Sequence, residues 1–540
     1  MNCNAVTPGR FSSPVLLKWL SIGIFTVLIF APLIALLVAA AEYVPTHYSD
    51  IAALLIPTER RLLLLLNSLG LSLAVSISGI AIGTLAAIRL WRCESGILSS
   101  LRWLVLVLTL VPPYIHALAW SSALQKLNDL LGGLGVSQVY FQGWAAAWWV
   151  QLMSSLPLAV GLALVGMKCV EPLFIDAARV IRSDIRSFIR IILPLAAPML
   201  LATAGILFLL NIMDYSVPYL FQLNVYPLEI FAEFSASNEP ARAFLYSLPL
   251  LIIAVFIVAS LQHGLRNVAQ STSWGKPSWL VSPTWPAWFH LLQWFAIAVL
   301  FLQVVVPLFS LTALTGTWHS MLTSITSASS EITFTLWVAL LAALLSLPLA
   351  AGTAIELFRQ QRWRWLWWLI VLMPLAVPPP LIGVGLISIW NRPMLLDIYG
   401  SAAMPVLAAL VRFTSFAVLV LAVQLKYIDR LLIDAAAIIQ PKRFRIWSRV
   451  WFPMLLPGLL AAAGIVFAMT TGELGATLLV APPGQATLTM RIYNFLHYGS
   501  TSTVAGLCLL MAAIALATGL IAIGALAWWA RLSSGKERSA

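Results

Sequence analysis

The sequence predicts an all-α membrane protein of about 12 transmembrane helices, arranged as two tandem six-helix repeats. Three observations lead to this fold class. Of the 540 residues, 61% are hydrophobic and only 9% are charged, whereas soluble domains carry about 25% charged residues. Apolar runs long enough to cross a hydrocarbon core of about 30 Å recur along the whole chain. A set of short patterns also occurs once in each half.

The apolar runs predict helices, because they lack the in-out alternation of a membrane barrel. Twelve spans are expected, at residues 15–41, 62–88, 102–122, 144–168, 195–221, 242–262, 290–315, 332–357, 365–390, 402–425, 454–480 and 501–530. With the N-terminus inside, inner loops hold 24 of the 31 Lys and Arg residues and outer loops hold six. Since basic loops stay cytoplasmic, we expect an inner-membrane protein with both termini in the cytoplasm.

The net charge of +12 therefore reflects topology and contact with anionic lipid, and nucleic acid is not an expected partner. The four cysteines form no metal-binding pattern, and no metal site is assigned. The chain also lacks a GxxxxGK[ST] phosphate loop, a GxSxG elbow and an HExxH helix. We expect a chain that is not an enzyme, has no cofactor of its own and cannot hydrolyse ATP by itself.

Internal repetition divides the chain into a first half at residues 1–262, a cytoplasmic linker at 263–289 and a second half at 290–540. Proline pairs at Pro112 and Pro378 interrupt the third span of each half. Because each half has an even number of spans, both have the same orientation in the membrane.

One repeated pattern follows the fourth span of each half, in a basic loop between apolar runs. Its residues are Asp176, Ala177, Ala178, Leu193 and Pro194 in the first half, and Asp434, Ala435, Ala436, Phe452 and Pro453 in the second. Apolar residues at helical spacing, such as Phe174 and Ala178, predict a short amphipathic helix in each loop. Such a helix can dock in another protein's groove; the alternative is that it lies on lipid.

These loops resemble the docking loop of permease subunits in binding-protein-dependent ABC importers, which reads EAA, three residues, Gly, nine residues, Ile, one residue, Leu-Pro. Here Asp replaces Glu, and Arg182 and Gln440 replace Gly. The resemblance covers nearly the whole chain and implies the type I ABC importer permease (MetI-like) fold. It also implies two partners, a cytoplasmic ATPase dimer that binds ATP and the docking loops, and a periplasmic substrate-binding protein.

Three ionisable residues near or within spans are candidates for the transport pathway, namely Asp214, Glu473 and Arg412. Each acid follows its loop proline by 20 residues, which is about 30 Å of helix. The two acids either form an outer gate for a cation, or each caps a helix end or pairs with a basic group such as Arg491. Arg412 in the tenth span needs an acid, carbonyl groups or an anion as partner, so both a structural and an anion-binding role remain open.

The fused two-half arrangement most resembles the ferric-iron and thiamine permease group, which makes ferric iron the expected substrate. Thiamine, a polyamine, an organophosphonate and an oxyanion are the alternatives within the importer class. An ion-coupled secondary transporter is the alternative from another class, because it would also show repeats and buried acids.

Overall fold

The computed structural model describes residues 15–48, 54, 56, 58–91, 102, 104–105, 107–138, 140–171, 174, 177, 180, 183–270, 284–359, 364–426, 428, 435, 438, 443–498 and 501–534. These residues form helices and no strands. Ten helices are long and apolar enough to cross a membrane, and a bent pair, α16 and α17, gives an eleventh span if it is counted as one. The expected all-α membrane fold is confirmed.

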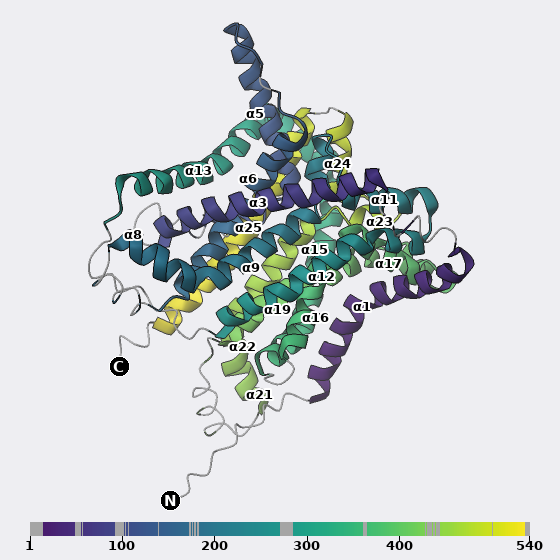
Figure 1. Ribbon diagram of the computed structural model, residues 1–540. Helices are drawn as coiled ribbons and strands as arrows, with labels where there is room; N and C mark the ends of the chain where they lie inside the picture. The colour runs from purple at the N-terminus through teal and green to yellow at the C-terminus, as the bar shows by residue number, and fades with distance from the viewer. Residues whose placement is uncertain are drawn as a thin grey trace, which may run out of the picture.

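The first half and the second half have matching series of helices (Figure 1). The first contains α1 (Val15–Thr46), α3 (Glu59–Trp91), α5 (Pro113–Gly133), α6 (Gly143–Lys168), α8 (Asp184–Ser187), η1 (Phe188–Ile192), α9 (Leu193–Ile212), α10 (Ser216–Leu220), α11 (Tyr226–Ser237) and α12 (Pro240–Gln270). The second contains α13 (Ala287–Thr315), α14 (Trp318–Ser327), α15 (Ser329–Arg359), α16 (Arg364–Ala376), α17 (Pro379–Trp390), η2 (Pro393–Leu395), α18 (Leu396–Tyr399), α19 (Ala403–Lys426), α21 (Arg443–Ile446), η3 (Trp447–Trp451), α22 (Phe452–Thr471), α23 (Thr477–Val480), α24 (Leu488–Tyr498) and α25 (Thr501–Ser534).

The same helix pairs pack together in both halves. In the first, α3 packs on α6 and α9, and α9 packs on α12. In the second, α15 packs on α19 and α22, and α22 packs on α25. Equivalent packing of equivalent helices is what a two-repeat permease fold requires.

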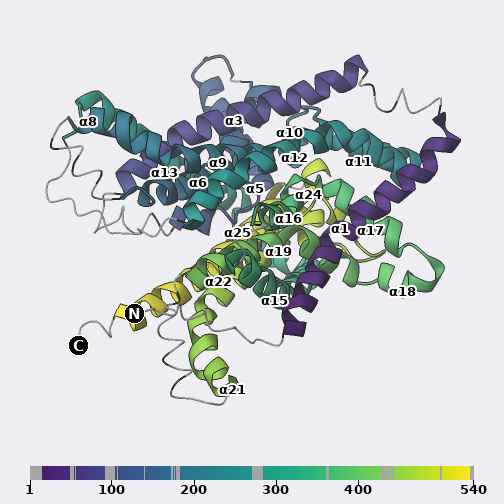
Figure 2. The ribbon, with the colours of Figure 1, turned by 60° about the horizontal axis from the view of Figure 1, so that its bottom comes forward.

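The first helix of each half packs on the other half (Figure 2). Helix α1 lies along α15 and α17, where Lys18 Nζ is 2.6 Å from Glu356 Oε2. A Cβ atom added at Gly385 would lie 2.7 Å from Pro32, so this close approach requires glycine. Helix α13 packs in turn against α5 and α3 of the first half. We call this reciprocal packing of α1 and α13 the helix exchange, and it holds the two halves together.

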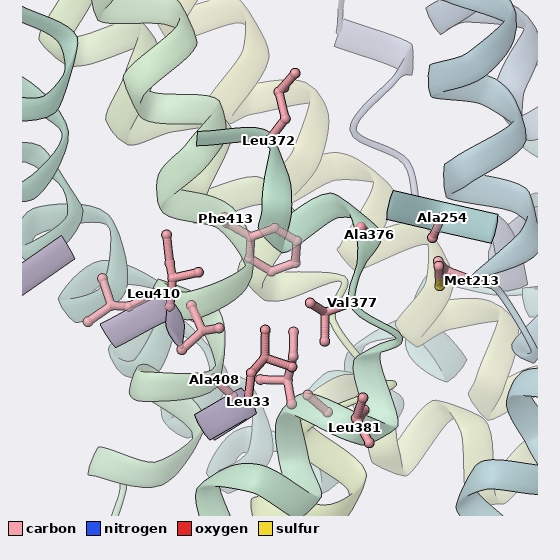
Figure 3. Close-up of a cluster of buried hydrophobic side chains, with 14 of the residues drawn as sticks. Leu33, Met213, Ala254, Leu372, Ala376, Val377, Leu381, Ala408, Leu410 and Phe413 are labelled. Carbon is pink, nitrogen blue, oxygen red and sulfur yellow. The ribbon is translucent and has the colours of Figure 1, made fainter. Parts of the chain in front are cut away.

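One large buried cluster joins the halves in the interior (Figure 3). Leu33 of α1 and Met213 after α9 belong to it, together with Val377, Leu410 and Phe413 of the second half. Because these side chains are almost entirely buried, their packing holds the break between α16 and α17 against the first half.

Four segments have boundaries that differ from those expected from the sequence. The expected third span, 102–122, is described only in part, and helix α5 begins at Pro113 and runs on to Gly133. The fifth and eleventh spans end early, at Ile212 and Thr471, because a polar break and a short helix follow each. The expected linker, 263–289, is helical at its start, since α12 continues to Gln270 with Leu265 packed on the core cluster.

Candidate functional site

The helices that follow the two predicted docking loops, α8 and α21, lie at the left and lower margins of the molecule in Figure 1. Asp176, Ala178, Asp434 and Ala436 lie outside the described residues. Ala177 and Ala435 are described and exposed. Two apolar neighbours are also exposed, with Val180 at 87% and Ile438 at 86%. Neither belongs to the apolar stripe expected from sequence.

Both loops return to the bundle through the same irregular element. The π-helices η1 and η3 each run directly into α9 and α22, so that Pro194 and Pro453 stand in the first turn of those helices. The helix is continuous through each π-turn, and a local π adjustment accommodates a proline, which lacks the backbone N–H donor. Single π-turns within α-helices occur frequently at functional sites. The segments that follow the two loops are therefore structurally equivalent.

At the opposite end of the same helices, Asp214 and Glu473 occupy equivalent positions. Asp214 accepts hydrogen bonds from the backbone N–H and the hydroxyl of Ser216, at 3.0 and 2.6 Å. Glu473 accepts from the backbone N–H groups of Ala476 and Thr477, both at 2.8 Å. Each carboxylate therefore caps the short helix that follows, α10 or α23, and this accounts for the break after the long helix.

The fourth span of each half supplies a second partner to the acid. In the first half Gln151 Nε2 donates to Asp214 at 3.2 Å. In the second, Arg412 Nη1 lies 2.5 Å from Glu473 Oε1. The Glu473 side chain has no exposure, whereas Arg412 retains 27%. One acid is thus neutralised by a cation, and the other is held by neutral donors.

Prolines from both halves meet at the segment that carries Glu473. A Cβ atom at Gly472 would lie 2.7 Å from Pro112 Cγ of the first half, and one at Gly475 would lie 2.6 Å from Pro379 Cβ of the second. Only glycine admits such an approach without displacement. Pro112 and Pro378 are also the residues before α5 and α17, and α16 and α17 meet at 96°. The prolines at the breaks of the two third spans therefore lie next to Glu473. We call this contact between the halves, formed around Pro112, Pro379 and residues 472–475, the seam.

Three seam residues were not expected from the sequence: Gln151, Tyr215 and Tyr493. Tyr215 is 3% exposed, and its hydroxyl has no hydrogen-bond partner among the described residues. Burial raises the pKa of Tyr215, and the nearby charge of Glu473 and the proximity of Tyr493 and Asp214 raise it further, while Arg412 opposes them. Charges of both halves thus act on one hydroxyl. Its position beside Asp214 in sequence is the only local signal.

Two stacked aromatic rings, one from each half, also make contact at the seam. The rings of Tyr219 in α10 and Tyr493 in α24 lie 6.4 Å apart and nearly parallel. Burial raises the pKa of Tyr493, with Tyr219 and then Asp214 adding to the effect. The charge of Asp214, from the first half, thus acts on Tyr493, from the second.

No protein-family model matches the chain. PhnV of Salmonella typhimurium, named as a 2-aminoethylphosphonate transport system permease protein, is 24% identical over 199 residues, which are 37% of this chain and 71% of PhnV. PhnU of Salmonella typhi, named for the same transport system, is 33% identical over 122 residues, 23% of this chain and 42% of PhnU. ModB of Escherichia coli, named as a molybdenum transport system permease protein, is 30% identical over 181 residues, 31% of this chain and 76% of ModB.

PhnV and ModB are each about half as long as this chain, since the matched stretch is most of either relative but about a third of the chain. Their length suits a chain built from two permease units in tandem. These three relatives are named for phosphonate and molybdenum transport, and ferric iron gains no support from them.

Proposed function

The chain belongs to the family of binding-protein-dependent ABC importer permeases, and we propose that its two halves together form the complete translocation path of one such importer. The exchanged helices α1 and α13 support this, because each half is packed against the first helix of the other. A second permease chain is then unnecessary, since the fused halves already supply two equivalent docking loops.

Two copies of an ATPase would bind the docking loops. Val180 and Ile438 support this, since apolar side chains exposed beside a basic loop are suited to a protein groove. With the docking loops in the cytoplasm, the seam around Glu473 lies at the outer ends of α9 and α22, where a periplasmic binding protein would deliver substrate. ATP-driven closure of the ATPase dimer would then move the halves and open or close the seam by alternating access.

The substrate is proposed to be a small phosphonate or a related oxyanion. The names of the relatives carry this proposal, because two are named for 2-aminoethylphosphonate and one for molybdenum transport. The partly exposed guanidinium of Arg412 supports it, since arginine binds tetrahedral oxyanions through paired donors.

Uptake in cells that lack other phosphonate and molybdate importers tests the proposal. The chain, expressed with its cognate ATPase and binding protein, should import 2-aminoethylphosphonate or molybdate; ferric iron serves as the comparison. An ATPase whose phosphate-loop lysine is replaced should abolish uptake. Uptake that persists with that ATPase and collapses when the ion gradients are dissipated would show an ion-coupled transporter instead.

A further inference from the structure

Resting on the proposed function, we propose that the seam is a receptor for a small zwitterion, with Arg412 and Tyr215 binding its oxyanion and Asp214 and Gln151 binding its positive group. Such a receptor would restrict the proposed substrates, phosphonates and related oxyanions, to those that also carry an ammonium group, such as an aminophosphonate.

The Arg412 guanidinium has N–H donors available to bind a ligand. Its Nη1 group pairs with Glu473, and its other guanidinium N–H groups have no hydrogen-bond partner in the part of the chain that the structure describes. A guanidinium carries five N–H donors in a planar fork that matches two oxygens of a phosphonate or carboxylate. Because Glu473 is fully buried and also held by two backbone N–H groups, it fixes the position of the fork.

Asp214 retains an uncompensated charge. Its described partners, Gln151 and Ser216, are neutral donors. Asp214, Glu473 and Arg412 together therefore leave one net negative charge at the seam. A doubly charged oxyanion would be repelled by that charge, whereas a substrate that also carries an ammonium group would neutralise it.

Two buried polar atoms at the seam lack partners and match the two groups of such a substrate. The Gln151 carbonyl oxygen Oε1, on a side chain that is fully buried, can accept from an ammonium group. The Tyr215 hydroxyl can donate to an oxyanion. A buried polar atom without a partner costs about 1–3 kcal/mol, so a ligand that supplies partners is favoured.

The residues of the receptor come from both halves, and the oxyanion would be bound by one residue of each, Tyr215 and Arg412. Gln151, Asp214 and Tyr215 come from α6 and the segment after α9, and Arg412 comes from α19. In this structure Gln151 and Tyr215 are buried. If the halves separate, Arg412 moves away from the other three residues, so a bound zwitterion would bridge the halves only while they are together.

Direct binding to the chain–ATPase complex in nanodiscs, without binding protein, tests the receptor. The probes are 2-aminoethylphosphonate and ethylphosphonate, which lacks the ammonium group. The wild-type complex should bind 2-aminoethylphosphonate at least tenfold more tightly than ethylphosphonate. Asp214→Asn should abolish this preference, and Tyr215→Phe should weaken both ligands. Tyr215→Phe is informative even if charge variants unfold, because its hydroxyl has no described protein partner. Asp397→Asn in α18 is the matched control and should bind as the wild type does.

Uptake measured on the same variants separates this inference from the proposed function. Import of 2-aminoethylphosphonate that is insensitive to Asp214→Asn and Tyr215→Phe overturns the receptor and leaves the proposed function standing. Equal binding of both phosphonates by the wild type also overturns the receptor, because the seam would then recognise only the phosphonate group and not the ammonium group. If only molybdate or ferric iron is imported, the aminophosphonate receptor and the phosphonate substrate both fail.

Discussion

The Arg412 guanidinium lies 2.5 Å from the Glu473 carboxylate, joining the fourth span of the second half to the segment after its fifth. The pair is uneven, because Glu473 has no exposed side-chain surface while Arg412 is 27% exposed. Glu473 also accepts two backbone N–H groups, so the arginine is held by an acid that is itself fixed. A structural role and a binding role are therefore compatible in one residue.

Arg412→Leu should destabilise the protein by on the order of 3 kcal/mol, because it leaves Glu473 charged and buried without its cation. The double variant Arg412→Leu, Glu473→Gln should recover much of that loss, since the remaining side chain is neutral. Thermal unfolding of the purified chain measures both. Equal stability of the wild type and Arg412→Leu would show that the pair contributes nothing to folding.

Gly472→Ala should destabilise the contact between the halves, because its Cβ atom would lie 2.7 Å from Pro112 Cγ. Overpacking of this kind costs about 1–3 kcal/mol. Gly132→Ala in α5 is the matched control, since nothing lies within 4 Å of its Cβ position and alanine favours a helix over glycine. Thermal unfolding should separate the two variants, and identical melting temperatures would contradict the close approach.

Val180→Glu and Ile438→Glu should each reduce co-purification of the ATPase, because a charge would be buried at the docking surface. Neither should alter membrane insertion, as both side chains are over 85% exposed. Met394→Glu, at a side chain 96% exposed in η2, is the control and should leave the complex intact. Retention of the ATPase by the double variant would exclude these residues from the interface.

A chain divided within residues 271–283 should still assemble from its two halves, because α1 and α13 are each packed on the other half. Gly385→Val should weaken that assembly, since its side chain would collide with Pro32 of α1. Gly23→Val, on the same helix as Pro32 but with nothing within 4 Å, should not. Co-purification of a tagged first half with the untagged second half gives the answer; equal yields from both variants would argue against the exchange.

Composition and the repeated patterns already predict the membrane-helical class, the two-half organisation and the place of both docking loops. Hydropathy and short motifs are local properties, and the bilayer leaves helices as the only structure for these runs. The 20-residue offset also places Asp214 and Glu473 at matching ends of α9 and α22, because helix rise is uniform.

Local pattern does not, however, show which polar groups meet. Tyr215 and Gln151 carry no motif. The packing of α6 on α9 brings Gln151 to Asp214, and the packing of the two halves exposes Tyr215 to the charges of Glu473 and Arg412. The exchange of α1 and α13 is likewise invisible in hydropathy, since any apolar helix can face lipid or protein. Packing between segments hundreds of residues apart decided both, through close contacts such as Pro112 against Gly472 that depend on shape and not on sequence period.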